Sequence, residues 1–387
     1  MVLTGSERIA SGDYLIPEGT RAALLANPAS VSSFLAHTAD ILIRGGISLK
    51  AVFGPQHGFR GETQANMIEW ASYTDPATGI PVYSLYGEQR SPTTEMLEGI
   101  ELMVIDLQDV GTRCYTYIWT AVLMMEKCAG LSIPVLVLDR PNPIGGESVE
   151  GPLIDEDYFS FVGLFPLPIR HGLTMAEILK MVNQERGIGC SLQTVCCRGW
   201  SRDIYFRETG LPWILPSPNM PSPDTALLYP GTVMLEGTNI SEGRGTTLPF
   251  QIIGAPFIDP AILSEQLSAR ELAGAAFRPV YFKPTWDKYT GEVCGGVQIH
   301  VLDREIFQPV RTGVHIIDAL SRICPDHFQF IPPPYEYEEE HMPIDIISGG
   351  DRLRRSIQRG FEPGRIFEEW EDQEKNFTLA RERFTIY

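Results

Sequence analysis

The first 140 residues alternate short apolar segments with turns that are polar or contain glycine. Each segment has the length of a strand and is apolar almost throughout, which indicates strands buried on both faces of a sheet. Spaced apolar positions between the strands predict helices, among them Ser33–Arg44, Ser91–Glu98 and Tyr117–Cys128. Strands that alternate with helices form βαβ units, so we expect an α/β fold with a doubly wound parallel sheet. The predicted strands are Arg21–Ala26, Leu49–Phe53, Pro81–Leu85, Leu102–Ile105 and Pro134–Leu138.

A proline-rich stretch divides the chain. Upstream of it, Thr174–Glu177 has the sequence of a capping box, which predicts that a helix follows. The stretch Leu211–Pro230 contains six prolines, too many for regular structure, and predicts a loop. We place a domain boundary near the end of this loop. The prediction is therefore an α/β domain over residues 1–230 and a second, smaller α/β domain over residues 231–387.

The second domain carries fewer clear patterns. Asp259 followed by proline begins a predicted helix, and Gly296–Leu302 alternates like a strand that is exposed on one face. We expect Thr312 to cap a helix that runs through Arg322, and Gly350–Arg359 to form a basic amphipathic helix. The acidic run Tyr335–Glu340 predicts a solvated loop.

Composition narrows the class of protein. The formal net charge of −18 argues against nucleic acid and anionic membrane as partners. The seven cysteines are scattered without a CxxC pair, so we expect reduced thiols. The N-terminus has no basic segment followed by an apolar one, and the chain has no apolar run of membrane-spanning length. We therefore expect a cytoplasmic protein, or an exported one if a leader segment has been removed.

Polar side chains follow one predicted strand after another. Ligands of open α/β sheets bind outside the carboxyl ends of the strands, so these side chains favour a site there. Each of them alone is as well explained by hydrogen bonds that tie loops together. The group consists of His57, Arg60, Tyr86, Asp106, Gln108, Asp109, Asp139, Arg140 and Asn142.

Several common site types are missing from the sequence. It contains no GxGxxG, P-loop or GxSxG phrase, so a dinucleotide, phosphate-loop or nucleophile-elbow site is not expected. It contains no HExxH or HxH phrase either, although His57, Asp106 and His171 remain an alternative as metal ligands distant in sequence.

A second concentration of chemistry lies at Glu236–Gly245, which holds Glu236, Glu242, Asn239 and Arg244 in a loop that three glycines should make flexible. Glycoside hydrolysis uses two carboxyl groups in different environments, one protonated and one ionised. The alternative is a polar loop in which Glu242 and Arg244 simply pair.

Two single residues are further candidates. The stiff loop Ser217–Pro221 presents Asn219, whose amide suits an N-acetyl or hydroxyl group, although turns often contain asparagine. His171 lies just before the capped helix, where a structural hydrogen bond is the alternative role.

Eight phrases of this sequence together resemble the NamZ-like exo-β-N-acetylmuramidases, and they extend over nearly the whole chain. The phrases are Gly54–Gly61 (GPQHGFRG), Ile80–Gly87 (IPVYSLYG), Asp106–Tyr117 (DLQDVGTRCYTY), Leu138–Gly146 (LDRPNPIGG), Glu150–Leu153 (EGPL), Arg170–Thr174 (RHGLT), Pro216–Pro221 (PSPNMP) and Tyr229–Thr247 (YPGTVMLEGTNISEGRGTT).

The resemblance implies a Rossmann-like domain, a smaller second domain and a cleft between them. It implies hydrolysis of the β-1,4 bond that holds N-acetylmuramic acid (MurNAc) at the non-reducing end of peptidoglycan fragments, without metal or organic cofactor. The substrate is then a small carbohydrate that carries a lactyl carboxylate, which calls for an arginine. The arginine candidates are Arg60, Arg113, Arg140 and Arg244.

For the chemistry we predict Glu242 and Glu236 as acid and base, with His57 orienting a reacting group and Asp106 or Asp109 as the alternative carboxyl group. The predicted substrate-binding residues are Gln56, Arg60, Tyr86, Gln108, Asp109, Arg113, Tyr117, Asp139, Arg140, Asn142, His171, Asn219, Asn239 and Arg244.

One position departs from the resemblance. The family commonly has glutamate in the phrase GPEHG, where this chain has Gln56. An amide cannot replace an acid or a nucleophile, so either that glutamate is dispensable, or the nearby Glu62 substitutes, or the activity is altered. Two rival classes follow, a muropeptide-binding module without catalysis and a metal-dependent hydrolase.

Overall fold

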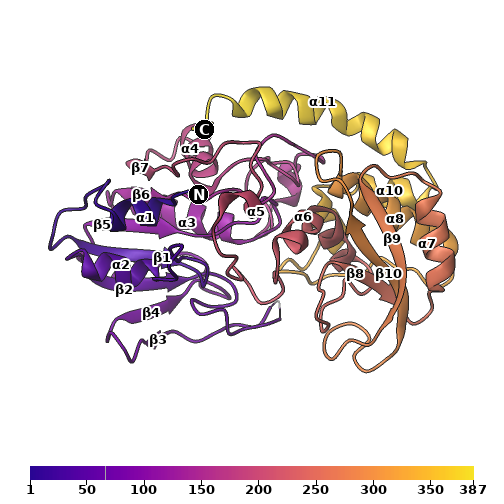
Figure 1. The fold of residues 1–387 in the computed structure, drawn as a ribbon, viewed down its shortest axis with the longest axis horizontal. Coiled ribbons are helices and arrows are strands. Elements are labelled where there is room, and N and C mark those ends of the chain that lie inside the picture. Colours follow the sequence, from indigo (N-terminus) through magenta and orange to yellow (C-terminus); the bar gives the residue numbers. More distant parts are fainter. Residues whose placement is uncertain (66) are drawn as a thin grey trace.

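The structure is a computed structural model that describes residues 1–65 and 67–387, and it has two domains side by side (Figure 1). The first domain holds a seven-stranded sheet of order β3-β4-β2-β1-β5-β6-β7. All neighbouring strands are parallel except the short β3, which pairs antiparallel with β4. The strands are β1 (Arg21–Ala26), β2 (Ser48–Gly54), β3 (Tyr73–Thr74), β4 (Pro81–Ser84), β5 (Leu102–Asp106), β6 (Val135–Leu138) and β7 (Leu192–Val195).

Helices cover both faces of this sheet. Successive residues of β1 show this, because Leu24 packs in one hydrophobic cluster and Leu25 in the other, and both are fully buried. The predicted doubly wound α/β sheet is confirmed. The helices of the first domain are α1 (Gly5–Ala10), α2 (Thr38–Arg44), α3 (Tyr117–Gly130), α4 (Met175–Glu185) and α5 (Phe206–Thr209), with 3-10 turns η1 (Glu95–Leu97) and η2 (Glu156–Tyr158).

Two predicted helices of this domain were too long. The helix expected over Ser33–Arg44 begins at Thr38, because Leu35 has a left-handed backbone (φ 64°) that a helix excludes and His37 caps the first turn. The helix expected over Ser91–Glu98 is only the single turn η1.

The second domain combines helices with a three-stranded antiparallel sheet of order β8-β10-β9. The predicted strand Gly296–Leu302 overlaps its central strand β10 up to Val301. The elements are α6 (Pro223–Thr232), η3 (Val233–Gly237), β8 (Ile252–Ala255), α7 (Pro260–Ser268), β9 (Ala275–Phe282), β10 (Cys294–Val301), α8 (Pro309–Ile323), α9 (Pro343–Ser348), α10 (Arg352–Gln358) and α11 (Pro363–Arg381).

Helix α6 corrects the prediction of a loop through Pro230. Ser222 caps it and Pro223 occupies its first turn, a start pattern that the surrounding prolines obscured. Helix α8 packs on α6, and a Cβ added to Gly231 would lie 1.9 Å from the carbonyl oxygen of Pro309, so glycine permits this close approach. Because α8 begins at Pro309, Thr312 lies inside it and is not its cap.

The long helix α11 runs back from the second domain to the first, where both chain termini lie (Figure 1). At its end, the buried Arg381 donates hydrogen bonds to the carbonyl oxygens of Glu147, His171 and Gly172. This helix therefore links the two domains by direct contacts. None of the described helices has the length and apolar character needed to span a membrane.

Candidate active site

A polar cavity lies where loops that follow β2 and β5 meet segments of the second domain. Its volume is about 30 Å³, enough for about one water molecule. A sugar ring therefore needs the walls to separate. The lining residues are Gln56, His57, Cys114, Tyr115, Thr116, Tyr117, Val162, Ser217, Asn219, Met220, Tyr229, Arg244, Phe250, Tyr335 and Glu336.

The structure thus brings five of the predicted site residues together. They come from segments far apart in sequence and are Gln56, His57, Tyr117, Asn219 and Arg244.

His57 lies in the loop after β2, with a left-handed backbone (φ 71°) and a buried side chain. Its Nδ1 is 2.7 Å from the carbonyl oxygen of Thr63, which assigns the proton to Nδ1 and leaves Nε2 as an acceptor. Burial lowers the pKa of His57 to about 4, against the opposing hydrogen bond to Thr63. The imidazole is therefore neutral at physiological pH.

Gln56, Tyr86 and Glu336 form a hydrogen-bonded group at the cavity. The Gln56 amide donates to Glu336 Oε1 (3.0 Å), and the Tyr86 hydroxyl donates to Glu336 Oε2 (2.8 Å). Gln56 Oε1 accepts from the Thr116 hydroxyl (2.6 Å). Burial raises the pKa of Glu336, although the hydrogen bonds from Tyr86 and Gln56 act in the opposite direction.

The prediction of a solvated loop over Tyr335–Glu340 was therefore wrong at its start. Tyr335 and Glu338 exchange both backbone hydrogen bonds, which makes a two-residue hairpin turn. Glu336 and Tyr337 occupy the turn with left-handed backbones (φ 48° and 64°), and Tyr335 and Glu336 are buried. An acidic run gave no local sign of this burial, since the partners of Glu336 are 250 and 280 residues away in sequence.

Arg244 organises a buried charge cluster on the second-domain side. Its guanidinium donates to Glu236 Oε1 (2.7 Å) and Glu242 Oε1 (3.3 Å), and Lys288 donates to Glu242 Oε2 (3.1 Å). Burial raises the pKa of Glu236 more than Arg244 lowers it. For Glu242, Lys288 and Arg244 outweigh burial, so its pKa is lowered.

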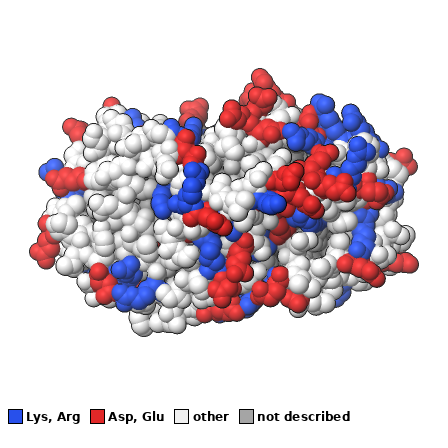
Figure 2. Space-filling view, turned by 90° about the horizontal axis from the view of Figure 1, so that it is seen from above, with Lys and Arg blue, Asp and Glu red and all other residues white. Residues whose placement is uncertain are grey.

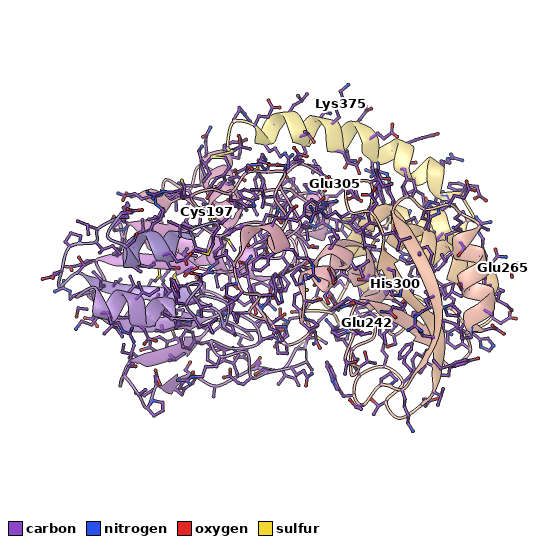
Figure 3. The ribbon with its side chains drawn as sticks, viewed as in Figure 1. Cys197, Glu242, Glu265, His300, Glu305 and Lys375 are labelled. Carbon is purple, nitrogen blue, oxygen red and sulfur yellow. The ribbon has the colours of Figure 1, made fainter. Side chains whose placement is uncertain are left out.

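The pKa values of the two carboxyl groups predicted as acid and base are thus shifted in opposite directions, but both groups lie behind the cavity wall. Arg244 and Tyr335 are wall residues, and the Tyr335 hydroxyl donates to Glu236 Oε2 (2.6 Å). Figure 3 labels Glu242 on the part of the second domain that lies toward the first. The loop is closely packed at Gly243, because a Cβ there would lie 2.5 Å from the carbonyl oxygen of Ile252.

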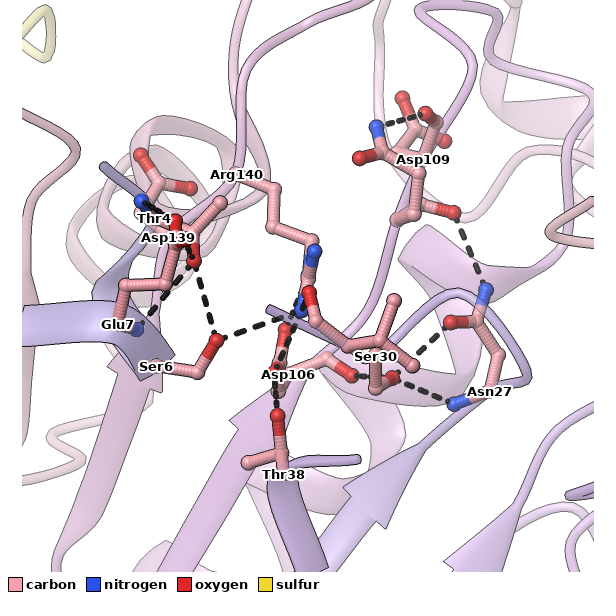
Figure 4. Close-up of polar contacts among 12 residues, drawn as sticks. Thr4, Ser6, Glu7, Asn27, Ser30, Thr38, Asp106, Asp109, Asp139 and Arg140 are labelled. Atoms are coloured by element: carbon pink, nitrogen blue, oxygen red, sulfur yellow. Dashed lines mark hydrogen bonds and ion pairs between the residues drawn. The ribbon is translucent and has the colours of Figure 1, made fainter. Parts of the chain in front are cut away.

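Most of the strand-end residues make structural contacts with the loops (Figure 4). Asp106 pairs with Arg140 and accepts from the hydroxyl of Thr38 at the start of α2. Asp139 accepts from the backbone N–H of Ala176 and from the C-terminal Tyr387 hydroxyl, and burial raises its pKa to about 7. These contacts explain the burial of the residues without any ligand.

The same holds for six further candidates, none of which lines the cavity in the part of the chain that the structure describes. Their side chains form hydrogen bonds with backbone groups. Gln108 donates to the carbonyl oxygens of Asp109 and Pro141, and Arg113 donates to those of Pro152, Leu167 and Ile347. Asn142 donates to Leu173 and Asn239 to His327, whereas His171 accepts from the backbone N–H of Leu173. Asp109 accepts from the backbone N–H of Gly111 and lies 3.5 Å from His171.

Arg60 lies outside the cavity. Its side chain is 56% exposed and pairs with Asp75 at 2.9 Å, beside a separate surface groove. Glu62, considered as a substitute for the missing glutamate, is exposed and is not a lining residue. Among residues 1–65 and 67–387, no group of three or more His, Cys, Asp or Glu side chains is arranged to hold a metal ion.

Charge is unevenly distributed on the surface. In the view from above, Figure 2 shows acidic side chains gathered mainly over the half that carries the second domain, with basic side chains interspersed among them.

The fold and the cavity define a two-domain α/β protein whose polar site is built from both domains. Comparison with known proteins then gives its class, because the family model of the exo-β-N-acetylmuramidase NamZ N-terminal domain matches residues 22–224 and that of the C-terminal domain matches residues 227–387. The chain belongs to the NamZ exo-β-N-acetylmuramidase family.

Individual relatives agree with this assignment. The chain is 43% identical over 382 residues to the peptidoglycan β-N-acetylmuramidase NamZ of Bacillus subtilis, covering 97% of this chain and 90% of the relative. Two crystal structures of DUF1343 family proteins from Bacteroides fragilis match 100% of this chain and 99% of theirs, with TM-scores of 0.90 and 0.78 and identities of 33% and 29%. The predicted family, fold class and enzyme class, a glycosidase that acts on a carbohydrate, are confirmed.

Proposed function

We propose that this protein hydrolyses the β-1,4 bond between a terminal MurNAc and the next N-acetylglucosamine (GlcNAc), and so releases MurNAc from the non-reducing end of peptidoglycan fragments. Family membership supports the reaction, and the cavity supports the substrate class. Its wall offers aromatic rings together with amide and hydroxyl groups, a combination that suits the alternating apolar and polar faces of a sugar.

The position of Arg244 in the cavity wall is the observation that carries this proposal. MurNAc differs from GlcNAc by a lactyl group that ends in a carboxylate, and an arginine N–H is a suitable donor for it. Of the four arginines predicted as candidates, Arg244 is the one that lines the cavity. Its Nε is buried and has no hydrogen-bond partner among the described residues, so this N–H can serve a ligand.

A pair of chromogenic substrates tests the proposal. The purified protein is incubated with a MurNAc β-glycoside and with the matching GlcNAc β-glycoside, each with and without EDTA. We expect release from the MurNAc substrate alone and the same rate in EDTA. Equal cleavage of both substrates would refute the preference for MurNAc. Binding of the MurNAc compound without product would refute hydrolysis, and loss of activity in EDTA would point to a metal-dependent hydrolase.

A further inference from the structure

Among the described residues that line the cavity, Glu336 is the one with a carboxyl group, and its environment differs from that of the buried Glu236 and Glu242. It is 2% exposed, although glutamates are seldom buried without a charged partner. Glu236 and Glu242 have ion pairs with Arg244, whereas none of the ion pairs among the described residues involves Glu336. Its two oxygens instead accept hydrogen bonds from the neutral groups of Gln56 and Tyr86.

The turn that carries Glu336 is strained and is held in place. Left-handed backbone is unfavourable for residues other than glycine, and Glu336 and Tyr337 both adopt it. Arg90 holds the turn from the first domain. Its guanidinium lies between the rings of Phe161 (4.6 Å) and Tyr337 (4.7 Å) and donates to the backbone oxygen of Glu336 (3.2 Å). Strain of this kind persists where surrounding contacts enforce it, and it is typical of functional sites.

Gln56 has a defined orientation toward this carboxyl group. Because its Oε1 accepts from Thr116, its amide N–H groups face Glu336 and Tyr86. An amide cannot give a proton to a leaving group, so position 56 cannot be the acid in this chain. It can orient a neighbouring carboxyl group.

We propose that Glu336 is a catalytic residue of this enzyme, the general acid that protonates the glycosidic oxygen, and that Gln56 and Tyr86 position it. This inference rests on the proposed function. The Glu336 proton passes to the glycosidic oxygen as the bond from that oxygen to C1 breaks, and the bonding electron pair stays on the oxygen of the departing GlcNAc. Water adds its oxygen to C1, and its proton goes to Nε2 of His57, the open acceptor of the cavity wall. Solvent then carries this proton from His57 back to Glu336.

The dependence on the leaving group tests this role. Glu336→Gln keeps the shape of the side chain but has no acidic proton. We expect kcat on the disaccharide MurNAc-GlcNAc to fall about 100-fold or more, as for loss of a general acid. A 4-nitrophenyl MurNAc β-glycoside, whose leaving group needs no protonation, should lose at least tenfold less. Glu339→Gln, an exposed glutamate three residues away, is the control and should match the wild type on both substrates.

Each outcome is decisive when thermal unfolding shows that the variants are folded. Equal losses on the two substrates, or no loss on either, would overturn the role of Glu336 while wild-type cleavage still supports the proposed function. A wild-type protein that cleaves neither substrate would overturn both proposals.

A second variant tests the positioning by Tyr86. Tyr86→Phe removes a hydrogen bond that favours the ionised form of Glu336, so the alkaline limb of the pH profile of kcat/KM should move to higher pH. An unchanged limb in an active variant would overturn the inference.

Discussion

Two buried side chains, His57 and Arg244, show how this fold accommodates ionisable groups away from water. His57 avoids a charge by staying neutral, while Arg244 keeps its charge and shares it between Glu236 and Glu242. Both solutions depend on one or two specific partners. Changes at either residue should therefore have effects that are large and that differ in their dependence on pH.

The neutral state of His57 makes part of the stability depend on pH. Its folded-state pKa of about 4 lies below the unfolded value of about 6.5, so the unfolded chain binds the proton first and the contribution is lost as pH falls through this window. Between pH 7 and pH 5 the loss is about 2 kcal/mol.

His57→Asn isolates this contribution. Asparagine tolerates the left-handed backbone and can donate to Thr63 in place of Nδ1, but it does not titrate. We expect the difference in unfolding free energy between wild type and variant to shift by about 2 kcal/mol against the wild type from pH 7 to pH 5, measured by urea denaturation. Asp139 titrates in both proteins, so its contribution cancels in the difference between them. A difference that is the same at both pH values would contradict a neutral buried His57.

Removing the charge of Arg244 should be costly. Arg244→Met removes the ion pair of Glu236 with Arg244 and weakens the pairing of Glu242, and breaking a buried ion pair on one side costs about 3–5 kcal/mol. Arg60→Met is the control, because an exposed pair such as that of Arg60 with Asp75 contributes about 1 kcal/mol or less. Chemical denaturation of both variants measures the two losses. Similar losses would show that the Arg244 cluster is not a buried ion-pair network.

At the scale of elements, the site depends on how α6 and α8 pack. Helix α6 leads directly into η3, which carries Glu236, and α8 packs against α6. Their contact is close because Gly231 of α6 and Gly313 of α8 have no side chains. The position of the charge cluster behind the cavity thus depends on this helix contact.

A single methyl group tests this contact. Gly231→Ala would place its Cβ 1.9 Å from a backbone oxygen of α8, so the helices must move apart, and we expect a loss of about 1–3 kcal/mol in unfolding free energy. Gly364→Ala, in the helix α11 with open space around the added carbon, should be neutral or slightly stabilising. If both variants have the same midpoint of unfolding in guanidinium, α6 and α8 do not pack as closely as the structure indicates.

At the scale of the whole molecule, the sequence predicts the sheet well and the site in part. The strand Arg21–Ala26 was predicted with its observed bounds, because continuous apolar runs identify strands buried on both faces. Gln56, His57 and Arg244 were predicted as site residues and do line one cavity. The sequence phrases that contain these residues made the family recognisable, whereas the pattern of strands and helices alone would not have done so.

What the sequence could not predict depends on contacts between distant segments. Glu336 stands in an acidic run that resembles a solvated loop, and its burial arises from Gln56, 280 residues earlier. The strand-end residues such as Asp106 and Arg140 satisfied the same local pattern as site residues, yet they pair with each other. Only the three-dimensional arrangement distinguishes a side chain that binds a loop from one that faces a cavity.

The central claim is that the protein removes MurNAc from the non-reducing end, and two isomeric disaccharides test it most directly. The purified protein is incubated with MurNAc-β-1,4-GlcNAc and, separately, with GlcNAc-β-1,4-MurNAc, and the products are identified by mass spectrometry. We predict complete conversion of the first to free MurNAc and GlcNAc, with the second left intact. Cleavage of the second isomer, or of neither, would contradict the account.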